Sequence, residues 1–168
     1  SSATTWRRST ARSRTALSRR GIRYLCAVRG PAEVDYAGRE IGNAALANHL
    51  LTRQRGLVII AAHSSGSFVA HELFAELAAM EPRGPALLRR VVYYDLDGGE
   101  AGLTPEIVDQ LRRAYFVYAE DSTTGTLSAN AATMMALGVR YASAGGVLEV
   151  NPTRSGCAAG AKWCLHDA

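Results

Sequence analysis

The sequence predicts an α/β protein with three layers, in which a mostly parallel sheet carries helices on both faces. Apolar runs rich in β-branched and aromatic residues alternate with segments of helical periodicity along the whole chain. These runs are nearly continuous, as in strands that are buried on both faces. A length of 168 residues with 48% hydrophobic and 20% charged residues suits one globular domain.

The first half of the chain predicts a basic helix followed by two strand–helix pairs. Gly21 and the Gly30-Pro31 turn signal separate the early elements, and Gly56 precedes the run LVIIAA. Apolar residues in the segment that follows this run recur at helical spacing. The expected elements are a helix over 3–20, a strand over 22–28, a helix over 36–54, a strand over 57–62 and a helix over 67–80.

The second half continues the alternation. Thr104 and Pro105 form a strong helix start, with threonine as the N-cap and proline at the first helical position. The expected elements are a strand over 87–96, a helix over 106–113, a strand over 114–120, a helix over 127–142 and a strand over 145–151.

Positive charge is concentrated at the start of the chain. Residues 1–32 carry eight arginines and no acidic residue, which leaves 11 basic against 15 acidic residues in the remainder. Such a segment can contact nucleic acid or acidic lipid, but no aromatic interleaving, zinc spacing or RNA-binding motif accompanies it. We therefore interpret it as a solvated helix face and expect no nucleic-acid partner. No apolar run approaches the length of a membrane span.

The three cysteines suggest one disulfide. Cys157 and Cys164 flank the short segment AAGAKW, whereas Cys26 lies in an apolar run and is expected to be a buried thiol. A bridge between Cys157 and Cys164 would favour a secreted or periplasmic location.

A serine follows the strand over 57–62 at a turn built from small residues. The segment Ala62-His63-Ser64-Ser65-Gly66 matches the small-x-Ser-x-small pattern of a nucleophile elbow, between an apolar strand and an amphipathic helix. Such a turn would present the Ser64 hydroxyl above the sheet, while the backbone N–H of Ser65 stabilises an oxyanion.

Serine catalysis also requires a base and an acid that orients it. His166 follows the last expected strand, on a loop that the cysteine bridge would hold, and is the best candidate for the base. His63 lies inside the elbow and cannot easily fold back on the Ser64 hydroxyl, whereas His71 and His49 are expected to be structural or surface residues. Four acidic residues lie at the C-terminal ends of expected strands, where α/β sheets place their sites: Asp121, Glu120, Asp95 and Asp97. These four are the candidates for the acid.

These residues give the chain a resemblance to the α/β-hydrolase superfamily, and within it to small lipases and esterases with Ala-His-Ser-x-Gly at the elbow. The resemblance implies acyl-ester hydrolysis through Ser64 and His166, with an ester or lipid as substrate and without a cofactor or metal ion. In that family the acid usually follows the strand two after the elbow strand. This favours Asp121, with Asp97, Asp95 and Glu120 as alternatives.

One feature departs from the family pattern. The His-Gly loop that supplies the second oxyanion donor is missing, and the opening SSATTW resembles the segment that follows this loop. We therefore expect residues 1–168 to form a single hydrolase-like domain that lacks the N-terminal strands, with a separate N-terminal segment completing the fold. The short connection between the strands ending near Asp95 and beginning near Ala114 leaves little room for a lid, which favours short or medium acyl esters.

Two other functions fit parts of the pattern. The segment Asp95-Leu96-Asp97-Gly98 resembles the nucleophile motif of haloacid-dehalogenase-type phosphatases, which require magnesium. That family also needs a later lysine and an acidic pair, and the only lysine in this chain is Lys162. A binding module with the hydrolase fold would need no working Ser64–His166 pair.

Overall fold

The computed structural model describes residues 7–8, 26–27, 39–53, 55–151 and 157–167. The chain divides into two compact units, Ser1–Gly30 and Pro31–Ala168. In the first unit, β1 (Arg7–Arg8) pairs antiparallel with β2 (Cys26–Ala27). The helix predicted over 3–20 is therefore wrong at the two β1 residues, and its remainder lies outside the described residues. Most of the strand predicted over 22–28 also lies outside the described residues, and β2 falls within its range. The prediction of a single domain stays a prediction.

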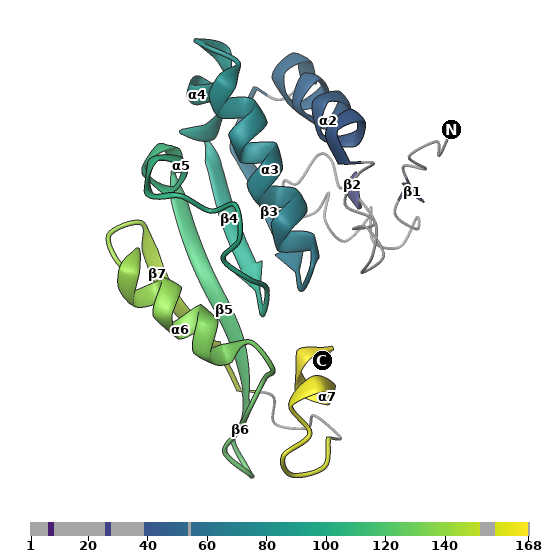
Figure 1. The fold of residues 1–168 in the computed structure, drawn as a ribbon, viewed down its shortest axis with the longest axis vertical. Coiled ribbons are helices and arrows are strands. Elements are labelled where there is room, and N and C mark those ends of the chain that lie inside the picture. The colour runs from purple at the N-terminus through teal and green to yellow at the C-terminus, as the bar shows by residue number, and fades with distance from the viewer. Residues whose placement is uncertain (1–6, 9–25, 28–38, 54, 152–156, 168) are drawn as a thin grey trace. The chain divides into compact units, whose positions relative to one another are not determined.

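The second unit contains a mostly parallel five-stranded sheet, which confirms the α/β class (Figure 1). Four parallel strands lie in the order β3-β4-β5-β7, and short β6 pairs antiparallel with the end of β5. The strands are β3 (Val58–His63), β4 (Val91–Leu96), β5 (Arg113–Asp121), β6 (Thr126–Leu127) and β7 (Gly145–Val150).

Most of the helices lie where the periodicity predicts them. They are α2 (Arg39–Arg53), α3 (Gly66–Ala79), α4 (Arg83–Leu88), α5 (Pro105–Gln110), α6 (Ala131–Arg140) and α7 (Lys162–His166). The predicted cap is confirmed, because Thr104 Oγ1 accepts a hydrogen bond from the Ile107 N–H and Pro105 is the first residue of α5. The predicted strand over 87–96 is wrong in its first residues, since Leu87 and Leu88 belong to α4.

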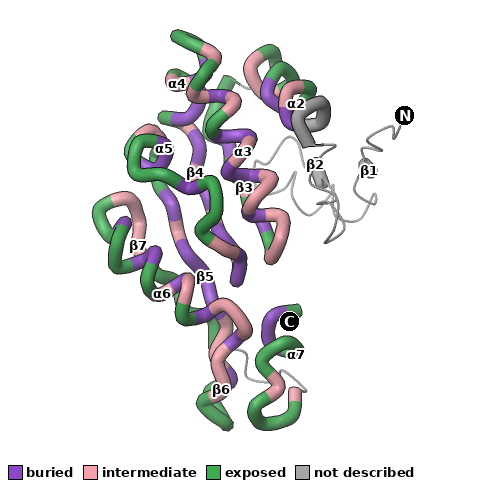
Figure 2. The backbone as a smooth tube through the Cα atoms, viewed as in Figure 1, coloured by how far each residue is buried: buried purple, intermediate pink, exposed green. Residues whose placement is uncertain are grey.

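The core lies between one face of the sheet and the helices α3 and α6. Tyr93 of β4 meets Phe74 of α3 edge-on, with ring centroids 5.0 Å apart, and Phe116 of β5 lies 5.9 Å from Tyr141 at the end of α6. All four side chains are buried, and Figure 2 shows β4 and β5 as buried or intermediate along almost their whole length. The register places Tyr93 and Phe116 on the same face of the sheet.

The opposite face is apolar but more open. Tyr94 and Tyr115 stack there with ring centroids 5.2 Å apart, while Ile59 is 55% and Val150 50% exposed. The described helices α3 and α6 pack against the Tyr93 face, so the second covering layer expected from the sequence stays a prediction. Among the described residues no helix is long and apolar enough to span a membrane.

Candidate active site

Ser64 lies in the tight turn between β3 and α3. Its φ is 55°, in the left-handed region that disfavours residues with a side chain. The Ser64 N–H donates to the carbonyl of Leu96 at 3.1 Å, which ties the turn to the end of the neighbouring strand β4. The Ser64 carbonyl accepts from the N–H and from Oγ of Ser67, at 3.0 and 2.8 Å. These bonds fix Ser64 in a tight turn directly after the last residue of β3.

Asp97 occupies the equivalent position after β4. Its φ is 45°, and Asp97 and Ser64 are the two non-glycine residues with positive φ in the described part of the chain. The Asp97 N–H donates to Val117 of β5 at 2.8 Å, and Asn130 Nδ2 donates to the Asp97 carbonyl at 2.7 Å. Strained backbone is concentrated at functional sites in proteins, so two such residues after neighbouring strands indicate a functional site.

The Asp97 carboxylate is buried, and it accepts several hydrogen bonds from other residues. Ser128 Oγ donates to Oδ1 at 2.7 Å, and the Asn130 N–H reaches both oxygens at 3.2 Å. The Asp97 residue is 5% exposed. Both carboxylate oxygens of Asp97 therefore have hydrogen-bond donors among the described residues.

His166 completes a buried acid–base pair. Its Nδ1 lies 2.5 Å from Asp97 Oδ2, and the residue is 7% exposed. Because a carboxylate only accepts, Nδ1 carries the proton and Nε2 keeps its lone pair in the neutral imidazole. This is the orientation in which a histidine serves as a general base.

The histidine also lies beside the serine turn. His63, the residue before Ser64, places Nε2 2.6 Å from the His166 carbonyl oxygen, and the two imidazole centroids are 4.6 Å apart. The Ser64 hydroxyl makes no hydrogen bond to His166 or to any other described residue, although His63, its neighbour in the chain, contacts His166. Catalytic hydrogen bonds are often long in ligand-free enzymes and shorten when substrate binds.

The acid favoured by the sequence has other contacts. Asp121 Oδ1 accepts from the N–H of Thr123 at 2.9 Å and from its hydroxyl at 2.6 Å, and its carbonyl accepts from Thr124 and Gly125. These bonds close the turn between β5 and β6. The carboxylate hydrogen-bonded to His166 is that of Asp97, which the sequence offered as an alternative.

Asp95, another alternative, lies in the core with both oxygens lacking a hydrogen-bond partner in the described structure. Burial raises the pKa of the Asp95 carboxyl, and His71, whose Nε2 is 3.5 Å away, offsets part of this. His71 Nδ1 meets the Ala101 carbonyl at 2.9 Å, and Tyr93 Oη lies 3.0 Å from His71 Nε2. A nucleophile must reach its substrate, so this burial gives the phosphatase alternative no support.

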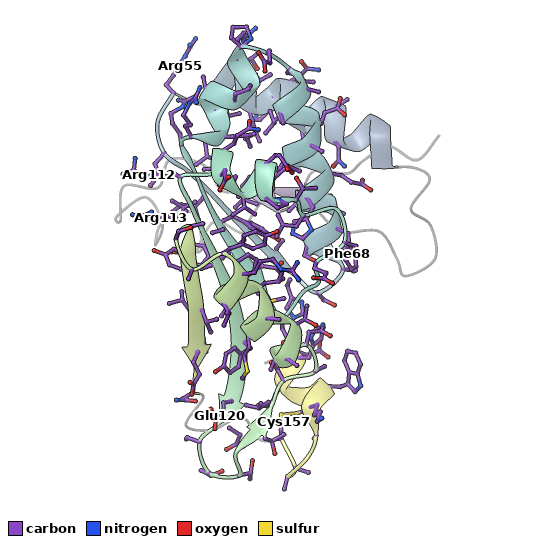
Figure 3. All side chains as sticks on the ribbon, turned by 60° about the vertical axis from the view of Figure 1, so that its left-hand side comes forward. Arg55, Phe68, Arg112, Arg113, Glu120 and Cys157 are labelled. Atoms are coloured by element: carbon purple, nitrogen blue, oxygen red, sulfur yellow. A yellow bond between two sulfur atoms is a disulfide. The ribbon has the colours of Figure 1, made fainter. Side chains whose placement is uncertain are left out.

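The predicted cysteine pair lies at disulfide distance, and the bridge joins Cys157 to Cys164 of α7. Cys157 and Glu120 lie at the same end of the second unit (Figure 3). His166 is two residues beyond Cys164, so the bridge holds the segment that carries the proposed base. The sequence predicted this bracing, although it placed His166 on a loop and α7 is a short helix.

Three contributing residues were missed from the sequence. Ser128 and Asn130, the donors to Asp97, lie within a predicted helix that begins only at Ala131. Their positions before a helix start were the available signal, since serine and asparagine favour such positions. Ser67 was also missed, and its Oγ accepts from the Gly99 N–H at 3.0 Å.

Comparisons of the chain with protein-family models, curated proteins and solved structures found no match. The case for function therefore depends on the residues and their geometry.

Proposed function

We propose that the chain is a serine hydrolase that cleaves carboxylic esters through an acyl-enzyme intermediate. Ser64 is the nucleophile, His166 the general base and Asp97 the acid that orients it. The observation that carries the proposal is the buried Asp97–His166 pair beside the strained Ser64 turn. Ser64 and Asp97 follow adjacent parallel strands and are linked through the hydrogen bond from Ser64 N–H to the Leu96 carbonyl.

The chemistry follows from the orientation of the imidazole. His166 Nε2 takes the hydroxyl proton as Ser64 Oγ forms a bond to the ester carbonyl carbon, and the same proton then goes to the leaving alcohol. Asp97 stabilises the imidazolium formed between these steps. Water, deprotonated by His166, next attacks the acyl carbon, and the carboxylic acid leaves as Ser64 recovers its proton.

The backbone of the turn supplies an oxyanion donor. The Ser65 N–H makes no backbone hydrogen bond to any described residue, and Ser65 immediately precedes α3. A free N–H at a helix start is suited to developing negative charge on the carbonyl oxygen.

The surroundings of His166 favour a hydrophobic ester. Trp163 is 68% exposed, and its ring stands edge-on to the His166 imidazole with centroids 5.2 Å apart. A large apolar side chain held at the surface beside the base offers a contact for an acyl or alcohol group. Short or medium acyl esters are therefore the substrates to test first.

A fluorophosphonate probe tests the nucleophile directly. We expect the probe to attach to Ser64 with loss of fluoride, and Ser64→Ala to abolish both labelling and the hydrolysis of nitrophenyl esters. Ser65→Ala is the matched control, because it removes a neighbouring hydroxyl and keeps the backbone N–H. Labelling that survives Ser64→Ala, or that is lost equally in a folded Ser65→Ala, contradicts the assignment.

The same experiment separates the hydrolase from a binding module of the same fold. A binding module would bind an ester without turnover and would leave Ser64 unlabelled. Folding of each variant is verified by circular dichroism, so that a missing label reports chemistry.

A further inference from the structure

A second cluster of chemically active side chains overlaps the proposed catalytic site. His63 ends β3, His166 lies in α7 and Asp167 follows it. One potential ligand atom from each lies within 4.8 Å of the other two. His63 and Asp167 are exposed, so the cluster is open to solvent on one side.

Two imidazoles and one carboxylate form a donor set that suits a transition metal. Zinc is held in open sites by three such ligands, with water in the fourth position. Ligand atoms about 2.0–2.1 Å from zinc in a tetrahedron are roughly 3.3 Å apart, so the three must approach one another slightly. The exposed side chain of Asp167 can turn toward the two imidazoles by a change of rotamer. Hard cations such as magnesium prefer oxygen-only sites.

Each histidine already has the supporting contact that a metal ligand requires. A ligating histidine generally donates its other ring N–H to a carboxylate or a backbone carbonyl. His166 Nδ1 makes this contact with Asp97 Oδ2 at 2.5 Å, and His63 Nε2 makes it with the His166 carbonyl at 2.6 Å. Each ring therefore keeps one nitrogen for a metal ion.

We propose that His63, His166 and Asp167 bind one zinc ion, and that this ion inhibits the hydrolase reversibly. The inhibitory part depends on the function proposed above. His166 Nε2 is the nitrogen that must accept the Ser64 proton, and a lone pair given to zinc cannot accept it. Metal binding and ester hydrolysis thus compete for one nitrogen atom.

Calorimetric titration of the metal-free 168-residue chain with zinc chloride tests binding without reference to activity. We expect one zinc ion per chain, with affinity reduced about tenfold or more in His63→Asn and in Asp167→Asn. His49→Asn, at an exposed position on α2, is the matched control and should bind as the wild type does. Magnesium chloride should give no binding. Zinc binding that is absent, or unchanged in both site variants, overturns the metal site.

Inhibition is then measured as the rate of fluorophosphonate labelling with and without zinc, each variant being compared with its own metal-free rate. We expect zinc to slow labelling of the wild type and of His49→Asn at least tenfold, and a chelator to restore it. His63→Asn and Asp167→Asn should need about tenfold more zinc.

The outcomes separate the two proposals. Zinc binding that depends on His63 and Asp167 but leaves the labelling rate unchanged overturns the inhibitory role. A chain that binds zinc in this way and is never labelled, with or without metal, contradicts the hydrolase while the metal site stands.

Discussion

Asp97 illustrates how one backbone position can decide which carboxylate meets the proposed base. Its φ of 45° turns the chain directly after β4, and its carboxylate then faces His166, Ser128 and Asn130. Asp121 is the last residue of β5, and its carboxylate bonds to Thr123. The chain order of serine, acid and histidine is the same for either aspartate.

At this scale we predict that Asp97→Asn lowers ester hydrolysis by roughly three to four orders of magnitude, because the amide no longer favours the Nδ1–H tautomer or stabilises the imidazolium. Asp121→Asn should leave kcat/KM nearly unchanged, since an asparagine oxygen still accepts from Thr123. Steady-state kinetics with a nitrophenyl ester measures both. If Asp121→Asn lowers kcat/KM strongly and Asp97→Asn does not, Asp121 is the acid.

The sequence predicted Ser64, His166 and the short list of acids, because turn chemistry and strand ends are local signals. It could not choose among the acids. That choice depends on which loop after a strand contacts α7. Neither the β5–β6 turn, which Asp121 closes, nor the helix at 162–166 has a strong sequence pattern of its own. The usual position of the acid in the hydrolase family favoured Asp121, whereas the hydrogen bond to His166 favours Asp97.

Among elements, the contact between β4 and α3 buries a carboxyl group in the core. Asp95 of β4 is fully buried beside His71 of α3, and burial raises the pKa of Asp95 above its ordinary 3.8. The folded state therefore binds this proton more tightly than the unfolded state does. Asp95 therefore makes the free energy of unfolding fall as the pH rises, first through the pKa of Asp95 in the unfolded chain and then through its higher pKa in the folded protein.

We predict that Asp95→Asn changes this pH dependence. Relative to Asp95→Asn, the wild type should lose stability between pH 4 and the raised folded pKa, because only the wild type must bury a charge there. Urea unfolding at a series of pH values measures the difference, with the exposed Asp109→Asn on α5 as control. A wild-type stability that rises relative to Asp95→Asn over this range would contradict the raised pKa.

The main elements were well predicted because long apolar runs and helical spacing are strong signals. The α5 cap is an example, since Thr104 and Pro105 act through their own backbone. The errors lie where tertiary contacts override propensity. Leu87 and Leu88 are apolar enough for a strand but are fully buried in α4, and two-residue β6 depends on pairing with β5.

For the whole molecule, the site depends on joining distant parts of the chain. Ser64 and Asp97 come from neighbouring strand ends, whereas His166 comes from α7 near residue 168. The Cys157–Cys164 bridge constrains the segment that carries this helix. For an eight-residue loop, the chain-entropy relation gives about 2–3 kcal/mol.

We predict that Cys157→Ser combined with Cys164→Ser loosens α7 and lowers ester hydrolysis, because His166 is no longer held against Asp97. Hydrogen exchange should show loss of protection in 162–166 with little change in β3 to β5. Cys26→Ser, which removes the third cysteine, is the control. Full activity in the double variant would show that packing alone holds His166 in position.

The strained backbone at Ser64 and Asp97 also has an evolutionary consequence. Glycine adopts positive φ without the cost of roughly 1–2 kcal/mol that a side chain incurs. Replacing Ser64 by glycine would therefore relax the fold while removing the proposed nucleophile. Replacing Asp97 would instead leave the buried donors of Ser128 and Asn130 without their acceptor. Stability alone gives no reason to keep serine at its turn, so a lineage that lost the need for the reaction would be expected to lose Ser64 early and to keep Asp97 and the sheet.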